Sequence, residues 1–224
     1  MEVFQKLLVW IDPVARDGPE AMSVDEWLLE TAALPVLRVY RWAGDWASVG
    51  YFGKIAEART AIADVQWVRR WTGGGMVDHR ADWTYTLAVP KDEPLAQARG
   101  AESYRWIHTA LAKTLAAESV VADLSGGESE TGEALCFENP VSHDLIGADG
   151  RKLAGAGQRR TRRGLLHQGS VIRAGDGLAS EKRAKCLAGF IAASPEIFQF
   201  QPDSDDLAAR MASRYSQPRW TEKH

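Results

Sequence analysis

Cysteine is scarce in this sequence: Cys136 and Cys186 are the two found among 224 residues. So few thiols exclude the disulfide framework that holds many small secreted proteins together. No cysteines or histidines have the spacing of zinc ligands, and we therefore expect no metal site. Each thiol needs a separate explanation.

Long apolar runs and an excess of one charge are also missing. No segment approaches the roughly 18 apolar residues of a membrane-spanning helix, and the N-terminal sequence MEVFQKLLVW has neither a basic leader nor a small-residue cleavage site. A net charge of -3 argues against a nucleic-acid binder that depends on bulk electrostatics. We expect a cytoplasmic protein that has neither membrane nor nucleic acid as a partner.

What the sequence does contain is typical of a globular protein, with 45% hydrophobic and 25% charged residues. Its length suits one sizeable core and is short for two full domains, so we expect a single domain over residues 1–224. Alternating apolar and polar residues predict strands, for example at 36–42 and 82–89. Helical spacing of apolar residues predicts helices at 20–31 and 94–120.

The order of the expected elements favours hairpins over strict strand-helix-strand repeats. It predicts an α+β fold, with a central mixed, mainly antiparallel sheet that is flanked by helices. Two further helices are expected within about residues 176–216, and the tail PRWTEKH has no evident fold. The segment 124–135 is rich in Gly, Ser and Glu, which is typical of a mobile loop.

The most informative stretch is VRRWTGGGMVDHRADWTYTLAVP at residues 68–90. Its glycine triplet, residues 73–75, follows two arginines and precedes an alternating apolar run, which predicts a tight loop leading into a half-buried strand. A glycine triplet alone is more often a flexible turn. Arg69 and Arg70 favour a ligand-binding loop, because guanidinium groups suit phosphate or carboxylate. His79 follows four residues after the last glycine.

A second stretch, RKLAGAGQRRTRRGLLHQGSVI at residues 151–172, carries related chemistry. A lysine after Asp-Gly-Arg is ordinarily a solvated turn residue. Lys152, however, opens a strand of small residues at 153–157 that would let a ligand approach the backbone. An ammonium at such a place can bind an acyl carbonyl or a phosphate oxygen as charge develops. The arginines at 159–163 form either a solvated basic turn or a contact with an acidic partner.

The segments RRWTGGGMVDH and GRKLAGAGQRR, the latter followed by LLHQGSVI, resemble the signature of the biotin/lipoate protein ligase and octanoyltransferase superfamily. The resemblance extends more weakly to IDPVARDGPEAMSVDEWLLE and LRVYRWAGDWASVGYF. It implies a central sheet flanked by helices, as the pattern of elements also predicts. It further implies that Lys152 is the lysine that contacts the activated acyl group.

Two branches of this superfamily remain open. Lipoate ligases activate lipoate with ATP and Mg²⁺ and need no cysteine. A group of octanoyltransferases instead carries a nucleophilic cysteine in a Cys-Phe segment shortly before the lysine motif, and takes the acyl chain from acyl carrier protein as a thioester. CFENPVSHDLIGADGRKLAG is similar to this second pattern. Lys152 and the arginines near the glycines could lower the pKa of the Cys136 thiol, although Cys136 would also fit as a small buried hydrophobe, as Cys186 does.

Our expectation is therefore a cofactor-independent transferase that moves an octanoyl or lipoyl group from acyl carrier protein to a lysine of a lipoyl-domain protein. An ATP- and Mg²⁺-dependent lipoate-protein ligase and a non-catalytic binder of an acyl chain or carrier protein stay open. The catalytic candidates are Cys136 and Lys152. The substrate-binding candidates are Arg70, Gly73, Gly74, Gly75, Met76, Val77, His79, Gly155, Ala156, His167 and Gly169.

The histidines receive different interpretations. Imidazole titrates near neutral pH, so His79 and His143 are candidates for a base or an orienting group. His79 occupies the family's histidine position, but Arg80 follows where an aspartate is common, so the motif does not assign its partner. The resemblance places His167 beside the acyl pocket, as a binding residue. It also makes acyl-pocket candidates of Ser48, Gly50 and Tyr51.

Overall fold

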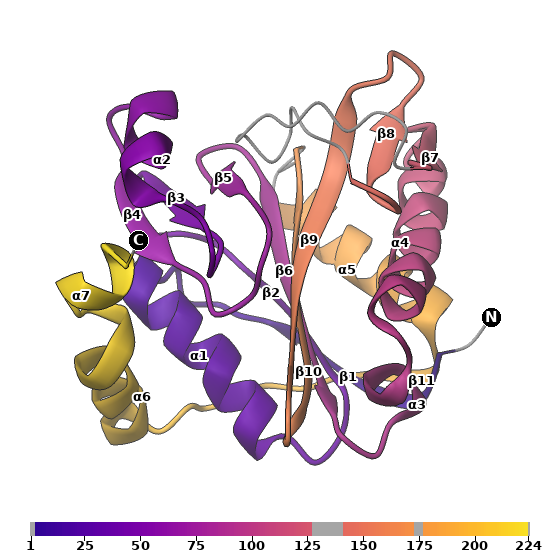
Figure 1. Cartoon of the computed structure of the whole chain (residues 1–224). Coiled ribbons are helices and arrows are strands. Elements are labelled where there is room, and N and C mark those ends of the chain that lie inside the picture. Colours follow the sequence, from indigo (N-terminus) through magenta and orange to yellow (C-terminus); the bar gives the residue numbers. More distant parts are fainter. Residues whose placement is uncertain (1–2, 127–140, 173–176, 224) are drawn as a thin grey trace.

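The computed structural model describes residues 3–126, 141–172 and 177–223 (Figure 1). Cys136 and most of the segment 124–135 lie outside these ranges. The described chain contains two sheets, one of eight strands and one of three. The large sheet confirms the predicted α+β class, and the single-domain organisation stays a prediction.

The large sheet has the strand order β11-β1-β2-β6-β10-β9-β8-β7. β1 pairs in parallel with both β11 and β2, and the other neighbours are antiparallel. The sheet is therefore mixed and mainly antiparallel, as expected. Its strands are β1 Phe4–Ile11, β2 Val36–Tyr40, β6 Trp83–Pro90, β7 Ala122–Leu124, β8 Leu145–Gly147, β9 Lys152–Thr161, β10 Gly164–Val171 and β11 Ala192–Ile197.

The small sheet was not foreseen as a separate unit. Its order is β4-β3-β5, with β3 Trp46–Val49, β4 Gln66–Arg69 and β5 Met76–Asp78. The glycine triplet lies in the connection between β4 and β5. The short helix α2, Ile55–Ala61, packs on this sheet through Ile55 and Ala58.

Helices cover both faces of the large sheet. The helix α4, Gly100–Ala117, and the helix α5, Gly177–Ile191, contribute apolar side chains to the core on one face. The helix α1, Gly18–Thr31, packs on the other face through Val24 and Leu28. Asp17 caps α1, because its carboxylate accepts the Glu20 N–H at 2.8 Å. The predicted helix at 94–120 is interrupted after the short helix α3, Pro94–Gln97.

The C-terminal part differs from the expected pair of helices. A strand, β11, stands between α5 and the next helix and pairs with β1. Pro195 within it cannot continue a helix, since it lacks the backbone N–H. The chain then forms α6 Ser204–Arg210, the π-helix η1 Met211–Tyr215 and α7 Pro218–Thr221. The tail, expected to have no fold, therefore contains a helical turn.

Two searches of the described ranges gave negative results. None of their helices combines the length and apolar character that crossing a membrane requires. Nor do these ranges contain a group of three or more His, Cys, Asp or Glu side chains placed to hold a metal ion.

Candidate active site

A narrow cavity of about 20 Å³ lies between the small sheet and strands β9 and β10. Apolar side chains that include Met22, Trp42 and Val77 form part of its wall. Six of the predicted substrate-binding residues line it: Arg70, Val77, His79, Gly155, Ala156 and Gly169. The structure thus brings the two informative stretches of sequence to one place.

The close approach of the two stretches depends on glycine. A Cβ atom on Gly157 would lie 2.3 Å from the carbonyl oxygen of Gly73, which no side chain can do without displacing the backbone. Gly74 has a φ of +94°, a region that favours glycine. A side chain at Gly157 would separate the loop from β9, and one at Gly74 would strain the loop backbone.

Lys152 is buried and forms an ion pair. Its Nζ lies 2.6 Å from Oδ2 of Asp144, and the two side chains are 2% and 0% exposed. Gly155 makes room for this arrangement, because a Cβ there would lie 2.6 Å from Nζ. A charge this deeply buried requires a charged partner. Lys152 is therefore not the solvated turn residue that its Asp-Gly-Arg context alone would suggest.

Asp144 is itself held by several donors. The Tyr104 hydroxyl lies 2.5 Å from Oδ1, and the Val141 N–H donates to Oδ2 at 2.8 Å. The same Tyr104 hydroxyl accepts the Ala156 N–H at 2.7 Å. Neither side chain was singled out from the sequence: Tyr104 lay within the predicted helix at 94–120, and Asp144 received no role. The available signal was an aspartate shortly before the lysine motif.

Two histidines lie beside this network, between α4 and the sheet. His108 donates through Nδ1 to the His143 carbonyl at 2.8 Å, and burial lowers its pKa to about 4. His167 lies with Nδ1 3.0 Å from the Gln158 amide nitrogen and Nε2 3.1 Å from the Tyr85 hydroxyl. Burial also lowers the pKa of His167 well below the usual range. The structure places His167 against these neighbours and not in the cavity wall.

Arg70 shapes the glycine loop. Its Nη2 donates to the carbonyls of Gly73 and Gly75 at 3.2 and 3.0 Å. Its Nη1 donates to the Ser48 hydroxyl at 2.6 Å. Arg69 was expected to supply charge for a ligand as well, but its guanidinium group is buried and binds backbone carbonyls on the far side of β4.

His79 has partners at both ring nitrogens. Nδ1 lies 2.7 Å from Asp82 Oδ2, and Nε2 lies 2.6 Å from the Ser48 hydroxyl. The ring stacks on Trp42 with a centroid separation of 4.1 Å. Because Arg70 already donates to the Ser48 oxygen, the Ser48 O–H is available for Nε2, and Nδ1–H then donates to Asp82. Asp82 is thus the partner that the motif did not assign. The engaged nitrogens favour an orienting role for His79.

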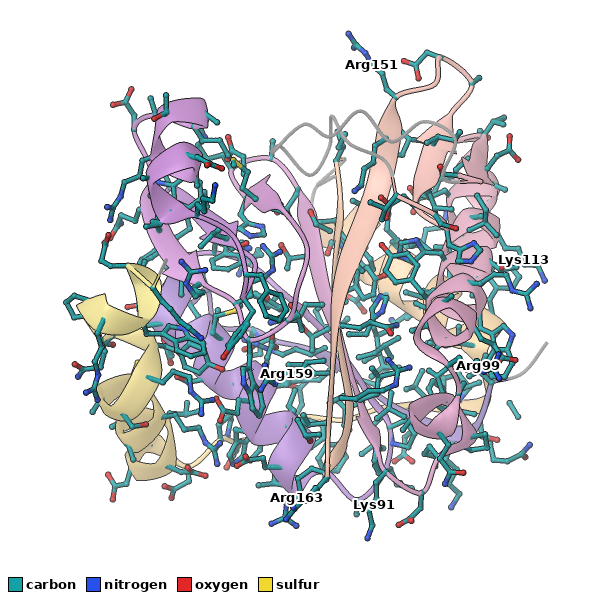
Figure 2. All side chains as sticks on the ribbon, viewed as in Figure 1. Lys91, Arg99, Lys113, Arg151, Arg159 and Arg163 are labelled. Carbon is teal, nitrogen blue, oxygen red and sulfur yellow. The ribbon has the colours of Figure 1, made fainter. Side chains whose placement is uncertain are left out.

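The remaining candidates are distributed around the loop. Met76 packs on α2 in the core of the small sheet, and the Tyr51 backbone N–H donates to the Thr72 carbonyl at 2.8 Å. The arginine run divides: Arg159 turns inward over the Trp71 ring at 4.5 Å, whereas Arg163 lies at the periphery beside Lys91 (Figure 2). Cys136 lies outside the described residues, and Cys186 on α5 is a half-buried free thiol.

Comparisons with known proteins identify relatives of this chain. Residues 17–197 match the family model described as the lipoyl protein ligase A/B catalytic domain. Octanoyltransferase LipM of Carboxydothermus hydrogenoformans is 34% identical in an alignment of 174 positions that covers 73% of this chain and 64% of that protein. Octanoyltransferase LipM of Symbiobacterium thermophilum is 31% identical over 72% of this chain and 64% of its own length. The chain thus spans less than two thirds of the length of these relatives.

One solved structure has a similar fold over nearly its whole length. Lipoate-protein ligase A bound with ATP has a TM-score of 0.71 and 17% identity, and the match covers 99% of both chains. At this identity the likeness shows the fold alone.

Proposed function

We propose that this chain, which belongs to the lipoyl protein ligase A/B catalytic domain family, is an acyltransferase of protein lipoylation. It moves an octanoyl or lipoyl group from acyl carrier protein to a lysine of a lipoyl-domain protein. The observation that carries the proposal is the buried Lys152, which Asp144 holds at 2.6 Å. Lys152 does not itself line the cavity, but its ammonium lies against Gly155, which does: a Cβ on Gly155 would be 2.6 Å from Nζ.

The lining of this small cavity, more than its volume, suits an acyl substrate. Its wall combines the apolar side chains of Met22, Trp42 and Val77 with the bare backbone of Gly155 and Gly169. An acyl chain lying against these groups would remove apolar surface from water. The ammonium of Lys152 would bind the acyl carbonyl oxygen, where negative charge develops when a nucleophile attacks. Asp144 fixes the direction of this ammonium.

The nucleophile in this proposal is Cys136. It is chosen because its Cys-Phe segment is similar to that of the octanoyltransferases with a nucleophilic cysteine. Its thiolate attacks the carbonyl carbon of the donor thioester, and the bond from that carbon to the donor sulfur breaks. The donor leaves as a thiol that carries the proton first lost by Cys136. The neutral amine of the acceptor lysine then attacks the new thioester, the amide forms, and the Cys136 thiol is regenerated as the amine gives up its proton. No ATP is consumed, since the acyl group is already a thioester both on the carrier protein and on Cys136.

Incubation with octanoyl acyl carrier protein in the absence of ATP tests this function. Mass spectrometry should find one octanoyl group on the wild-type protein, located at Cys136 by peptide mapping. Cys186→Ser serves as the matched control and should be acylated normally, whereas Cys136→Ser should carry no acyl group and should not acylate a lipoyl domain. Full transfer by Cys136→Ser would remove the cysteine mechanism.

The ATP-dependent ligase is the second candidate, and the likeness to the fold of lipoate-protein ligase A bound with ATP favours it. Among the described residues, however, the cations expected to hold phosphate are engaged. Arg69 and Arg70 both donate to backbone carbonyls. ATP-dependent formation of an acyl-adenylate from lipoate would support the ligase. If neither an acyl-adenylate nor an acylated Cys136 forms, the non-catalytic binder is the remaining hypothesis.

A further inference from the structure

The C-terminal residues 217–223 return to the small sheet that carries the glycine loop. They lie outside the residues that match the family model. Figure 1 shows α7 and the C-terminus beside β4, across that sheet from the large one. We call residues 217–223 the C-terminal latch.

Arg69 connects the latch to the turn at residues 50–53. The guanidinium group is completely buried and donates in two directions. Toward the latch, Nε donates to the Trp220 carbonyl at 2.9 Å, and Nη2 donates to the carbonyls of Thr221 and Lys223 at 2.9 and 2.5 Å. Toward the turn, Nη1 is shared among three carbonyls, those of Gly50, Tyr51 and Gly53, at 2.7 to 3.1 Å.

Two side chains of the latch reinforce this link. The Trp220 indole N–H donates back to the Arg69 carbonyl at 3.0 Å. Lys223 Nζ donates to the Tyr51 hydroxyl at 2.7 Å and lies 4.0 Å from the centre of the Tyr51 ring. The turn is therefore held from its backbone and from its Tyr51 side chain.

The turn at residues 50–53 also holds the glycine loop. The N–H of Gly50 donates to the Gly75 carbonyl at 3.1 Å, and the N–H of Tyr51 donates to the Thr72 carbonyl at 2.8 Å. A Cβ atom on Gly50 would lie 2.0 Å from the Gly74 carbonyl oxygen, so the two backbones are in direct contact. A continuous set of hydrogen bonds thus runs from the latch through Arg69 and the turn to both sides of the loop.

We propose that the latch positions the glycine loop for acyl binding, with Trp220 and Lys223 as positioning residues that act through Arg69 and Tyr51. This inference rests on the proposed function, which places the acyl group at the loop. Glycines lower the stiffness of a loop, so a loop with three of them relies on outside contacts for a single conformation. When the binding-competent conformation is less populated, apparent affinity falls by the same fraction.

Two latch variants of the full chain test the proposal, with a third variant as control. Trp220→Phe removes the indole N–H and keeps an aromatic ring, and Lys223→Met removes the ammonium and keeps an apolar chain of similar length. Glu222→Gln is the control, because Glu222 belongs to the same segment but pairs at the surface with Arg59. Arg69 itself is not substituted, because the loss of this buried guanidinium group would destabilise the whole fold.

Two measurements are made on each protein: hydrogen-deuterium exchange of the backbone amides of Gly50 and Tyr51, and KM and kcat for transfer from octanoyl acyl carrier protein. Both latch variants should exchange these amides at least about fivefold faster and raise KM by a similar factor, with a smaller change in kcat. Glu222→Gln should match the wild type, and melting temperatures of all proteins should stay close together.

Unchanged exchange in both latch variants would overturn the proposal. Faster exchange with wild-type KM in an active enzyme would overturn it too, because the latch would then be purely structural. If the wild-type protein itself transfers no acyl group, the proposed function fails. The exchange rates still decide in that case whether the latch holds the loop.

Discussion

At the scale of single residues, the pairing of Lys152 with Asp144 dominates the site. Both charges are almost fully removed from water, and the geometry is good, with 2.6 Å between nitrogen and oxygen. A buried pair of this kind adds little net stability when complete, but removing one partner leaves an uncompensated charge. The pair therefore fixes where Lys152 points more than it stabilises the fold.

Replacing Asp144 by asparagine should be costly for this reason. Asp144→Asn keeps the shape and removes the charge, so we expect the free energy of unfolding to fall by about 3 kcal/mol and acyl transfer to fall strongly. Tyr104→Phe removes a hydrogen bond to the same carboxylate and the acceptor of the Ala156 N–H, and should cost about 1–3 kcal/mol. Urea unfolding and transfer rates measure both effects. Asp123→Asn, an exposed aspartate on β7, is the control; a wild-type rate in Asp144→Asn would contradict the assignment.

At the scale of elements, the site is a contact between a loop and a strand. The β4–β5 connection carries the glycines, and β9 supplies small residues opposite them. Thr72 in the loop donates to the Gln168 side-chain oxygen at 2.7 Å, which ties the loop to β10 as well. The elements meet backbone to backbone, so a single methyl group at the contact has a large effect.

Gly157→Ala tests that contact directly. The added Cβ would meet the Gly73 carbonyl oxygen at 2.3 Å. Because this oxygen belongs to the backbone, the clash cannot be relieved by rotating a side chain. We expect the free energy of unfolding to fall by about 1–3 kcal/mol and the KM for the acyl donor to rise. Gly189→Ala on α5 is the matched control: its Cβ would meet nothing within 4 Å, and alanine favours a helix, so stability should rise slightly. Equal behaviour of the two variants would contradict the close contact.

At the scale of the whole molecule, buried histidines couple folding to pH. Burial lowers the pKa of His108 from 6.5 to about 4 in the folded protein. Between these values the unfolded chain binds a proton that the folded chain does not, so stability falls as pH falls through this window and is fully present above it. His167, whose pKa is also lowered by burial, acts with the same sign.

Unfolding free energies at two pH values measure the coupling. From about pH 7 to about pH 5, the wild-type protein should lose about 2 kcal/mol more than His108→Asn, which keeps a donor for the His143 carbonyl and cannot titrate. Carboxylates contribute equally to both proteins, so the difference isolates His108. Equal losses in the two proteins would show that His108 does not carry a lowered pKa.

The large sheet and its helices were predictable to a considerable extent. Period-two alternation gave β2 and β6, and the apolar spacing through Ile107, Leu111 and Leu115 gave α4. The errors arose where a partner distant in sequence decides the structure. Residues 192–193 were predicted as the end of a helix and residues 194–197 as part of a link, yet together they form β11, which pairs with the edge of β1.

The sequence by itself determined a glycine loop and a strand of small residues that begins at Lys152, because glycine spacing and residue size are local properties. That the two form an acyl site is an implication of the family resemblance and stays a proposal. Tertiary structure alone decided the charge partners. Arg69 and Arg70 are neighbours in the chain but project to opposite sides of a strand, so one holds the latch and the other the loop. Lys152 received Asp144, and His79 received Asp82, through side-chain directions that no local pattern encodes.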